Sequence, residues 1–270
     1  MSVFNEIKKK LLSPDKFRKK YANDNLSKNA VFSYEYTTYG VLEDWSVFLE
    51  STSTLPLNKK FFNEILTINN KVKPYLDVEW LEEDYPGYDK DYVKIYIKEK
   101  IVEIFEEEFD IQLDHTNIKI TNCHRKVAQG FKYSYHFTIS TKNPQYVFKS
   151  PLEAIFLAKK LRFKIKIDHD KTGYSENIID INPYKKSQQI RLPGNCKPGD
   201  NHPLLMDCDN DDIADYIVTN VYKNYCILNV EEQSTDSNVK STVFDYSSKE
   251  IEYITNLVKE NIHPTAYLER

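Results

Sequence analysis

The sequence predicts a domain of mixed α/β or α+β class built on a mixed sheet. Segments with apolar residues at helical spacing are interspersed with short strand-like runs, several of which form hairpin-like pairs. The 270 residues, of which 40% are hydrophobic and 29% charged, are enough to bury a substantial core as one large domain or two small lobes. No apolar run is long enough to span a bilayer, so no membrane partner is expected.

Helices are expected where apolar residues recur every three or four positions, or where a start signal such as Ser150-Pro151 occurs. The predicted helices are 3–12, 57–70 after Pro56, 92–109, 150–163, a short one at 209–216, and 246–261. Residues 82–91 are expected to form a polar loop.

Strands are expected where apolar and polar residues alternate or a short apolar run lies between turn signals. The predicted strands are 30–36, 45–49, 73–80, 118–122, 132–141, 176–181, 188–192 and 225–230. Turn residues at Pro193-Gly194 and Pro198-Gly199 predict that 176–181 pairs with 188–192. Residues 1–230 are expected to form a two-lobed domain, and 231–270 a linker followed by a C-terminal helix.

The four cysteines are scattered without a CxxC pair, and we interpret Cys123, Cys196, Cys208 and Cys226 as free thiols. A zinc site formed by Cys196, His202 and Cys208 is an alternative, but the three residues lack a recognisable ligand spacing. The N-terminus has no apolar core like that of a signal peptide, so we expect an intracellular, reducing compartment.

Charge is segregated along the chain, although the net charge is only −4, from 37 basic and 41 acidic residues. Basic side chains concentrate at 8–20 and 159–171, and acidic ones at 82–84 and 106–108. Such segregation can create a local basic groove on an acidic protein. For any single run, the alternative is a solvated helix face.

Two carboxylates lie in the predicted strand at 73–80. Because side chains alternate along a strand, Asp77 and Glu79 share one face, while Leu76, Val78 and Trp80 share the other. Neighbouring anions repel and are rarely buried without a cation between them, so a divalent metal bound through oxygen ligands is the candidate. An exposed sheet edge is the alternative.

Two further strands carry polar groups that are unusual for their surroundings. Lys132, Ser134 and His136 share one face of the strand at 132–141, and Asp180 stands among isoleucines in the strand at 176–181. A histidine in a strand is more often structural, whereas an unpaired buried carboxylate is costly. Neither a Walker P-loop nor a dinucleotide fingerprint, HExxH helix or GxSxG elbow is present.

With Arg191 and Lys197, which follow Asp180, these residues make a chemically consistent set. Carboxylates hold divalent metals, while metals and basic side chains hold a triphosphate. Such a site could activate a hydroxyl nucleophile and stabilise the leaving pyrophosphate.

Three motifs resemble those of the archaeo-eukaryotic primase superfamily, nearest to its primase-polymerase and large-DNA-virus branches. The segment 75–79 resembles the first motif, an apolar run with Asp-x-Glu; 132–136 resembles the second, Ser-x-His after a basic residue; and 179–197 resembles the third. The resemblance covers Phe32 to Gly199 and implies a catalytic fold with an N-terminal α/β unit and an RRM-like palm with a mixed sheet.

The resemblance also implies roles for eight residues. Asp77, Glu79 and Asp180 would bind two Mg²⁺ or Mn²⁺ ions and form the catalytic centre. The incoming nucleotide would be held by Lys132, Ser134, His136, Arg191 and Lys197. The sequence departs from the pattern at Gln188, where relatives often have a basic residue. No residue after Gly40 can be assigned as the family's early arginine, and the C-terminal zinc-binding module of many relatives is not apparent.

The implied function is DNA primase or primase-polymerase activity, which makes or extends primers from NTPs or dNTPs on single-stranded DNA. The basic segments 8–20 and 159–171 would contact template phosphates. Related viral proteins often carry a helicase motor, so a replicative helicase is an expected partner, and a viral source with replication in the host cytoplasm or a viral replication site is consistent. Two alternatives remain: a non-catalytic nucleic-acid-binding accessory protein, and a metal-dependent nuclease.

Overall fold

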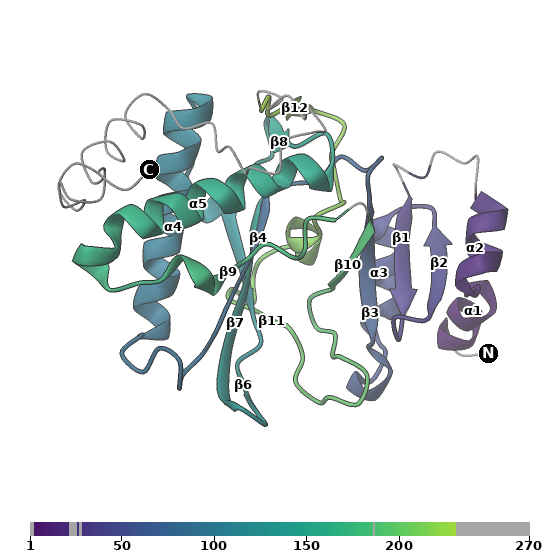
Figure 1. Ribbon diagram of the computed structural model, residues 1–270. Helices are drawn as coiled ribbons and strands as arrows, with labels where there is room; N and C mark the ends of the chain where they lie inside the picture. Colours follow the sequence, from purple (N-terminus) through teal and green to yellow (C-terminus); the bar gives the residue numbers. More distant parts are fainter. Residues whose placement is uncertain (1–2, 22–25, 27–28, 186, 231–270) are drawn as a thin grey trace, which may run out of the picture. The chain divides into compact units, whose positions relative to one another are not determined.

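The computed structural model describes residues 3–21, 26, 29–185 and 187–230, and every structural statement below concerns these residues. Helices and two antiparallel sheets lie in one compact unit that ends at Asn229 (Figure 1). The α+β class predicted from the sequence is therefore confirmed. The predicted helix at 246–261, and the linker before it, lie outside the described residues, so the predicted domain boundary stays a prediction.

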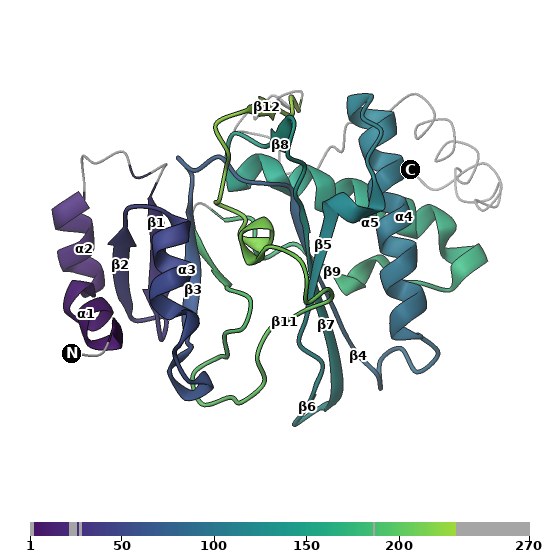
Figure 2. The same cartoon turned by 180° about the vertical axis from the view of Figure 1, so that it is seen from behind.

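The first sheet has strand order β10-β3-β1-β2, and all neighbouring pairs are antiparallel. Its strands are β1 (Ala30–Tyr34), β2 (Thr38–Leu42), β3 (Phe62–Thr67) and β10 (Ser187–Arg191). The helical elements near it are α1 (Val3–Lys10), α2 (Pro14–Tyr21), α3 (Trp45–Ser53) and the short η1 (Leu57–Lys59). Helix α3 covers one face of this sheet (Figure 2), where the rings of Phe48 and Phe32 are 4.8 Å apart.

The second sheet has strand order β11-β5-β7-β4-β9, with β6 also paired to β7, and it too is antiparallel. Its strands are β4 (Tyr75–Leu81), β5 (Ile118–Asn122), β6 (Arg125–Val127), β7 (Gly130–Ile139), β9 (Ile179–Asp180) and β11 (Leu205–Met206). The long helices α4 (Lys90–Phe109) and α5 (Pro151–Thr172) pack together on one side of it (Figures 1 and 2).

The remaining elements are short. The 3₁₀ turns are η2 (His115–Asn117), η3 (Glu176–Ile178) and η4 (Ile213–Tyr216). Strands β8 (Gln145–Val147) and β12 (Tyr225–Ile227) form a two-stranded parallel sheet. Parallel pairing among the described strands is confined to this pair, so the predicted mixed sheet is wrong for both larger sheets.

Two predicted elements have the wrong type. Residues 45–49 were expected as a strand but begin α3, because the Asp44 side chain caps the helix by accepting a hydrogen bond from the Val47 amide at 3.0 Å. Trp45, Phe48 and Thr52 are then buried at helical spacing. The segment 57–70 was expected as a helix, but after η1 it forms β3.

Strand β3 was mistaken for a helix because its residues are buried on both faces. Phe62 through Leu66 are all buried, so the strand lacks the two-residue alternation that would distinguish it from a helix. Its apolar residues, Phe62, Ile65 and Leu66, recur instead at a helical spacing of three to four, and the pairing with β1 and β10 fixes the strand.

The predicted pairing of 176–181 with 188–192 is also wrong. Strand β9 pairs with β4 in the second sheet, whereas β10 pairs with β3 in the first. The turn residues at 193–199 therefore do not close a hairpin between them. Residues 176–178 form η3, and only Ile179–Asp180 is strand. The chain thus crosses from one sheet to the other between the predicted carboxylate and the predicted arginine.

Candidate functional site

Strand β4 presents two carboxylates on the face that is turned away from α4 and α5. Asp77 and Glu79 keep side-chain exposures of 23% and 36%, whereas Leu76, Val78 and Trp80 on the other face are buried. The Trp80 ring stacks on Tyr133 on that buried side. The apolar positions of β4 thus anchor the strand in the core and leave its carboxylates facing a pocket.

Strand β7 places its polar side chains on the same face. The antiparallel register sets Asp77 opposite His136, Glu79 opposite Ser134, and Leu81 opposite Lys132, and directly opposed residues share a face. Lys132 Nζ lies 2.5 Å from Glu79 Oε2, so these two residues form an ion pair. The predicted face of the second motif therefore adjoins the predicted face of the first.

The third predicted carboxylate lies on the other side of β4. Asp180 in β9 is opposite Asp77, so the backbone brings all three carboxylate-bearing positions together on adjacent strands. The Asp180 side chain, however, turns to its own loop, where Oδ1 accepts hydrogen bonds from Asn182 N at 2.8 Å and Asn182 Nδ2 at 2.7 Å.

The three carboxylates do not converge as a finished metal site. Among the described residues, no group of three or more His, Cys, Asp or Glu side chains is arranged to hold a metal ion. In this structure Glu79 pairs with Lys132 and Asp180 bonds within its loop. A metal site formed by Asp77, Glu79 and Asp180 therefore stays a prediction, and so does the zinc alternative at Cys196, His202 and Cys208.

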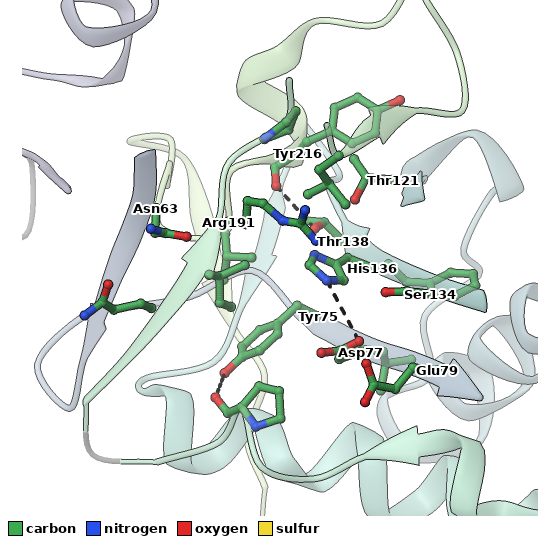
Figure 3. A pocket seen from close by; sticks show the side chains of 18 of the residues that line it. Asn63, Tyr75, Asp77, Glu79, Thr121, Ser134, His136, Thr138, Arg191 and Tyr216 are labelled. Carbon is green, nitrogen blue, oxygen red and sulfur yellow. Dashed lines mark hydrogen bonds and ion pairs between the residues drawn. The ribbon is translucent and has the colours of Figure 1, made fainter. Parts of the chain in front are cut away.

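Asp77 is the most perturbed of these groups. Burial, followed by the neighbouring charges of Glu79 and Asp180, raises its pKa from 3.8 to about 7. Its Oδ1 atom is buried without a hydrogen-bond partner. The nearest cationic candidate is His136, whose Nε2 is 3.9 Å from that oxygen (Figure 3). Lys132 and Lys197 oppose this rise only in part, so Asp77 lacks full compensation for its burial.

His136 does not supply that compensation. Burial and the nearby charges of Arg191, Lys197 and Lys132 lower its pKa from 6.5 to about 3, so the imidazole is neutral at physiological pH. The 3.9 Å approach to Asp77 is thus a contact between a carboxyl group and a neutral ring. A neutral imidazole can offer one N–H to a ligand without adding positive charge.

Arg191 forms the basic side of the pocket together with Lys197 and Lys132. It is 7% exposed, and its terminal NH1 donates to Cys123 Sγ and to the His202 carbonyl, each at 3.4 Å. The Nε of Arg191 is buried without a partner. Burial and the adjacent cations lower the pKa of Lys197, which reflects how closely these basic groups gather.

One pocket collects most of the predicted residues (Figure 3). Seven of the eight line it, namely Asp77, Glu79, Lys132, Ser134, His136, Arg191 and Lys197. The eighth, Asp180, is adjacent through its strand pairing but does not line it. Gln188, which stands where relatives often have a basic residue, also lines the pocket.

The pocket is also lined by residues that the sequence did not single out, among them Tyr36, Asn63 and Arg125. Tyr36 lies in the β1–β2 turn with a positive φ of 61°, and Asn63 lies on β3. Arg125 lies on β6, which pairs with β7. Of these three, only Arg125 could have been predicted from the sequence, because a basic residue shortly before Lys132 could share a hairpin with Lys132. Tyr36 and Asn63 reach the pocket because β10 joins their sheet to the pocket.

The two basic segments differ in their surroundings. In α5, Lys160 pairs with Glu108 at 3.0 Å and Lys164 with Glu107 at 2.8 Å, both across to α4. These helices cover the face of the second sheet opposite Asp77, so segment 159–171 is poorly placed to reach a template in the pocket. The segment 8–20 spans α1 and α2, where Phe17 packs on Tyr39 of β2 with ring centroids 5.5 Å apart.

Comparisons with known proteins give one limited similarity. No protein-family model matches the chain. A stretch of 206 residues, 72% of the chain, is 24% identical to an uncharacterized protein of Acanthamoeba polyphaga mimivirus that bears the name "putative helicase". The match spans 20% of that longer protein. Separately, no helix in the described part of the chain has the length and apolarity needed to cross a membrane.

Proposed function

We propose that the chain is a template-directed nucleotidyltransferase of the primase-polymerase type, which makes or extends primers from NTPs or dNTPs. One observation carries the proposal: Asp77 Oδ1 and Arg191 Nε, an acceptor and a donor, are both buried without partners in residues that line one pocket. An unsatisfied buried polar group costs about 1–3 kcal/mol. A ligand that brings a cation to Asp77 and an anion to Arg191 would relieve both, and a metal-bound triphosphate has that charge pattern.

The residues that would hold Mg²⁺ or Mn²⁺ are Asp77, Glu79 and Asp180. The orphaned Oδ1 of Asp77 fits this role, but Glu79 would have to leave Lys132, and the Asp180 side chain would have to leave Asn182. Bound there, two ions would lower the pKa of the attacking hydroxyl and neutralise charge on the reacting phosphate. The carboxylates present are the ligand type that these hard cations prefer.

The remaining residues have roles set by their charge state. Arg191 and Lys197 would neutralise the triphosphate and the charge that develops on pyrophosphate. Lys132, once released from Glu79, would add a third positive charge. Ser134 and the neutral His136 would donate hydrogen bonds to phosphate oxygens, because neither adds to the repulsion among the cations.

Template and partner assignments rest on other observations. The exposed basic side chains of α1 and α2 are the candidate contacts to the phosphates of single-stranded DNA, because those of α5 lie on the opposite side of the second sheet. The match to a mimivirus protein with a helicase name supports a viral replication setting and a replicative helicase as a partner.

A non-catalytic nucleic-acid-binding protein is the second candidate, and one observation favours it. The described carboxylates do not form a metal-ligand group, as expected if the chain kept the fold and lost the activity. A metal-dependent nuclease is less well supported, because it gives no reason for a buried Arg191 with an unpartnered Nε beside Lys197.

The test is incorporation of labelled NTPs or dNTPs on single-stranded DNA, with and without a primer, in Mg²⁺ or Mn²⁺. We expect incorporation by the wild-type chain and its loss in Asp77→Asn and Asp180→Asn variants that keep the wild-type circular dichroism. Nucleotide binding without incorporation would favour the non-catalytic candidate. Full activity in either variant would refute the assignment of the carboxylates.

A further inference from the structure

Arg125 occupies an electrostatically unfavourable position at the edge of the pocket. The β6–β7 register sets it directly opposite Lys132, and both side chains face the pocket with exposures of only 12% and 23%. Like charges placed opposite each other across an antiparallel pair are destabilising. Unfavourable local interactions of this kind concentrate at functional sites. The presence of the pair on a pocket wall therefore indicates a role in binding.

Two residues, Cys123 and Asp200, contact the Arg125 side chain. Its NH1 donates to Cys123 Sγ at 3.4 Å and to the Cys123 carbonyl at 3.3 Å, and its Nε lies 3.5 Å from Asp200 Oδ2. The same sulfur accepts a hydrogen bond from Arg191 NH1 at 3.4 Å. One thiol thus holds two guanidinium groups side by side, and both arginines line the pocket.

The basic groups outnumber the carboxylates that pair with them. Arg125, Lys132, Arg191 and Lys197 all line the pocket, and the ion pairs formed there are Lys132 with Glu79 and Arg125 with Asp200. The positive charge also acts on Tyr36, which lines the same pocket. Arg191 and Arg125 both act to lower the pKa of Tyr36, although burial raises that pKa overall. A ligand with several negative charges would balance this excess.

We infer that Arg125 is a further polyphosphate-binding residue, which acts with Arg191 and Lys197 on one anion and which Cys123 holds in position. The inference rests on the proposed function, and it names a phosphate contact that the three motifs do not include. An arginine suits this place because its planar donors can contact two phosphate oxygens at once. It also supplies positive charge that Gln188 does not.

The experiment compares Arg125→Gln with Lys126→Gln, a matched control that removes the same charge from the next residue of β6, which is exposed. Calorimetry measures binding of inorganic tripolyphosphate, and kinetics measure KM for the nucleotide. We expect Arg125→Gln to weaken tripolyphosphate binding and raise KM by at least about tenfold, the loss of one strong charge-assisted hydrogen bond. Lys126→Gln should match the wild type in both.

Asp200→Asn separates phosphate binding from a structural role of Arg125. This variant removes the partner carboxylate and keeps the guanidinium, so tripolyphosphate binding should stay equal or strengthen. If Asp200→Asn weakens binding as much as Arg125→Gln does, the arginine only holds the 197–204 loop and the inference is wrong. Thermal unfolding is read in parallel, and if Arg125→Gln fails to fold, Arg125→Lys takes its place with the same expected direction.

The outcomes also separate this inference from the proposed function. Wild-type tripolyphosphate binding in Arg125→Gln overturns the inference, and incorporation by both proteins would leave the polymerase proposal standing. Binding of tripolyphosphate that depends on Arg125, without incorporation by the wild type, would support the inference as a polyphosphate site and overturn the polymerase. No tripolyphosphate binding by the wild type overturns the inference directly.

Discussion

At the scale of single residues, Asp77 is held in the folded chain at an energetic cost. Its carboxyl group is buried beside the charges of Glu79 and Asp180, and its Oδ1 has no hydrogen-bond partner. Nothing in the packing requires a carboxyl group there, since Leu76 and Val78 on the opposite face anchor the strand. A residue that weakens the fold and is nevertheless present in a pocket is best explained by what it binds.

The first prediction concerns the stability of Asp77→Asn. Because the folded-state pKa of Asp77 is raised from 3.8 to about 7, its carboxyl group favours folding most below pH 3.8, and this contribution is lost as the pH rises through 7. The free energy of unfolding of the asparagine variant should therefore exceed that of the wild type by about 1–3 kcal/mol at pH 8 in EDTA. This difference in stability should become smaller at pH 4.

Urea unfolding measures this difference, and Asp84→Asn is the control because Asp84 is an exposed carboxylate in the loop after β4. The control should leave the unfolding midpoint unchanged at both pH values. An Asp77→Asn variant less stable than the wild type at pH 8 would show that Asp77 has a structural role, and it would remove the reason for assigning the residue to a ligand.

At the scale of elements, the β6–β7 hairpin depends on one glycine. Gly130 begins β7 with a φ of +126°, a conformation that residues with a Cβ rarely adopt, and a Cβ there would collide with the Glu83 carboxylate. The hairpin it closes carries Arg125 and Lys132 on its two strands. The positions of Arg125 and Lys132 therefore depend on a glycine that contributes no side chain to the pocket.

The second prediction is that Gly130→Ala destabilises the chain by about 1–2 kcal/mol, mainly through backbone strain, since the flexible Glu83 side chain can move. Gly87→Ala is the matched control, because a Cβ there meets nothing within 4 Å and its φ is not in the strained range. Urea unfolding of both variants gives the comparison. Equal midpoints would mean that the turn relaxes without cost.

The same scale shows which elements the sequence could predict. Strands β4 and β7 alternate buried and pocket-facing side chains, so their polar faces could be predicted from a period of two. Strand β3 could not, because burial on both faces leaves no period. Helix α3 was taken for a strand because its five-residue start is too short to show a period, and the Asp44 cap that decides it is a single contact.

At the scale of the whole described unit, a buried polar network connects β3 with the segment after η4. The Glu64 carboxylate of β3 accepts hydrogen bonds from Val218 N at 3.0 Å, Thr219 N at 2.9 Å and Thr219 Oγ1 at 2.9 Å. Lys73, just before β4, donates to the carbonyls of Ala214 at 3.0 Å and Asp215 at 3.1 Å. Residues 214–219 thus tie the two sheets together.

The third prediction is the pH dependence of this connection. Burial raises the pKa of Glu64 from 4.5 to about 7, with the three hydrogen bonds and Lys73 opposing the rise. The stability that Glu64 contributes is therefore fully present below pH 4.5 and is lost as the pH rises through 7. The wild type should lose roughly 3 kcal/mol more than Glu64→Gln between these pH values.

Urea unfolding at pH 4.5, 5.5 and 7 measures both proteins. Asp77 titrates in the same range, but it is present in both chains and cancels in the comparison. Burial lowers the pKa of Lys73 to about 7, so this lysine begins to lose its proton only at the upper end of the range. Parallel curves for the two proteins would show that Glu64 is ionised throughout and is compensated by its three hydrogen bonds.

At this scale the limit of sequence-based prediction is also physical. The period of each strand identifies which side chains share a face, which is why Lys132, Ser134 and His136 could be grouped in advance. Which strands lie side by side is decided by pairing between distant segments, and β9 and β10 join different sheets. Asn63 and Tyr36 reach the pocket only through that arrangement, and the side-chain rotations of Glu79 and Asp180 depend on partners the pattern does not reveal.

The crossing of the chain between Asp180 and Ser187 has a mechanical consequence. The acceptor at Asp77 belongs to one sheet and the donor at Arg191 to the other, so a small rotation of the sheets against each other lengthens or shortens the span between them. A ligand that contacts both Asp77 and Arg191 would hold the two sheets at one spacing. The affinity for such a ligand would then depend on the distance between the two sheets. Substitutions in the distant Glu64 network would therefore alter ligand binding without contacting the ligand.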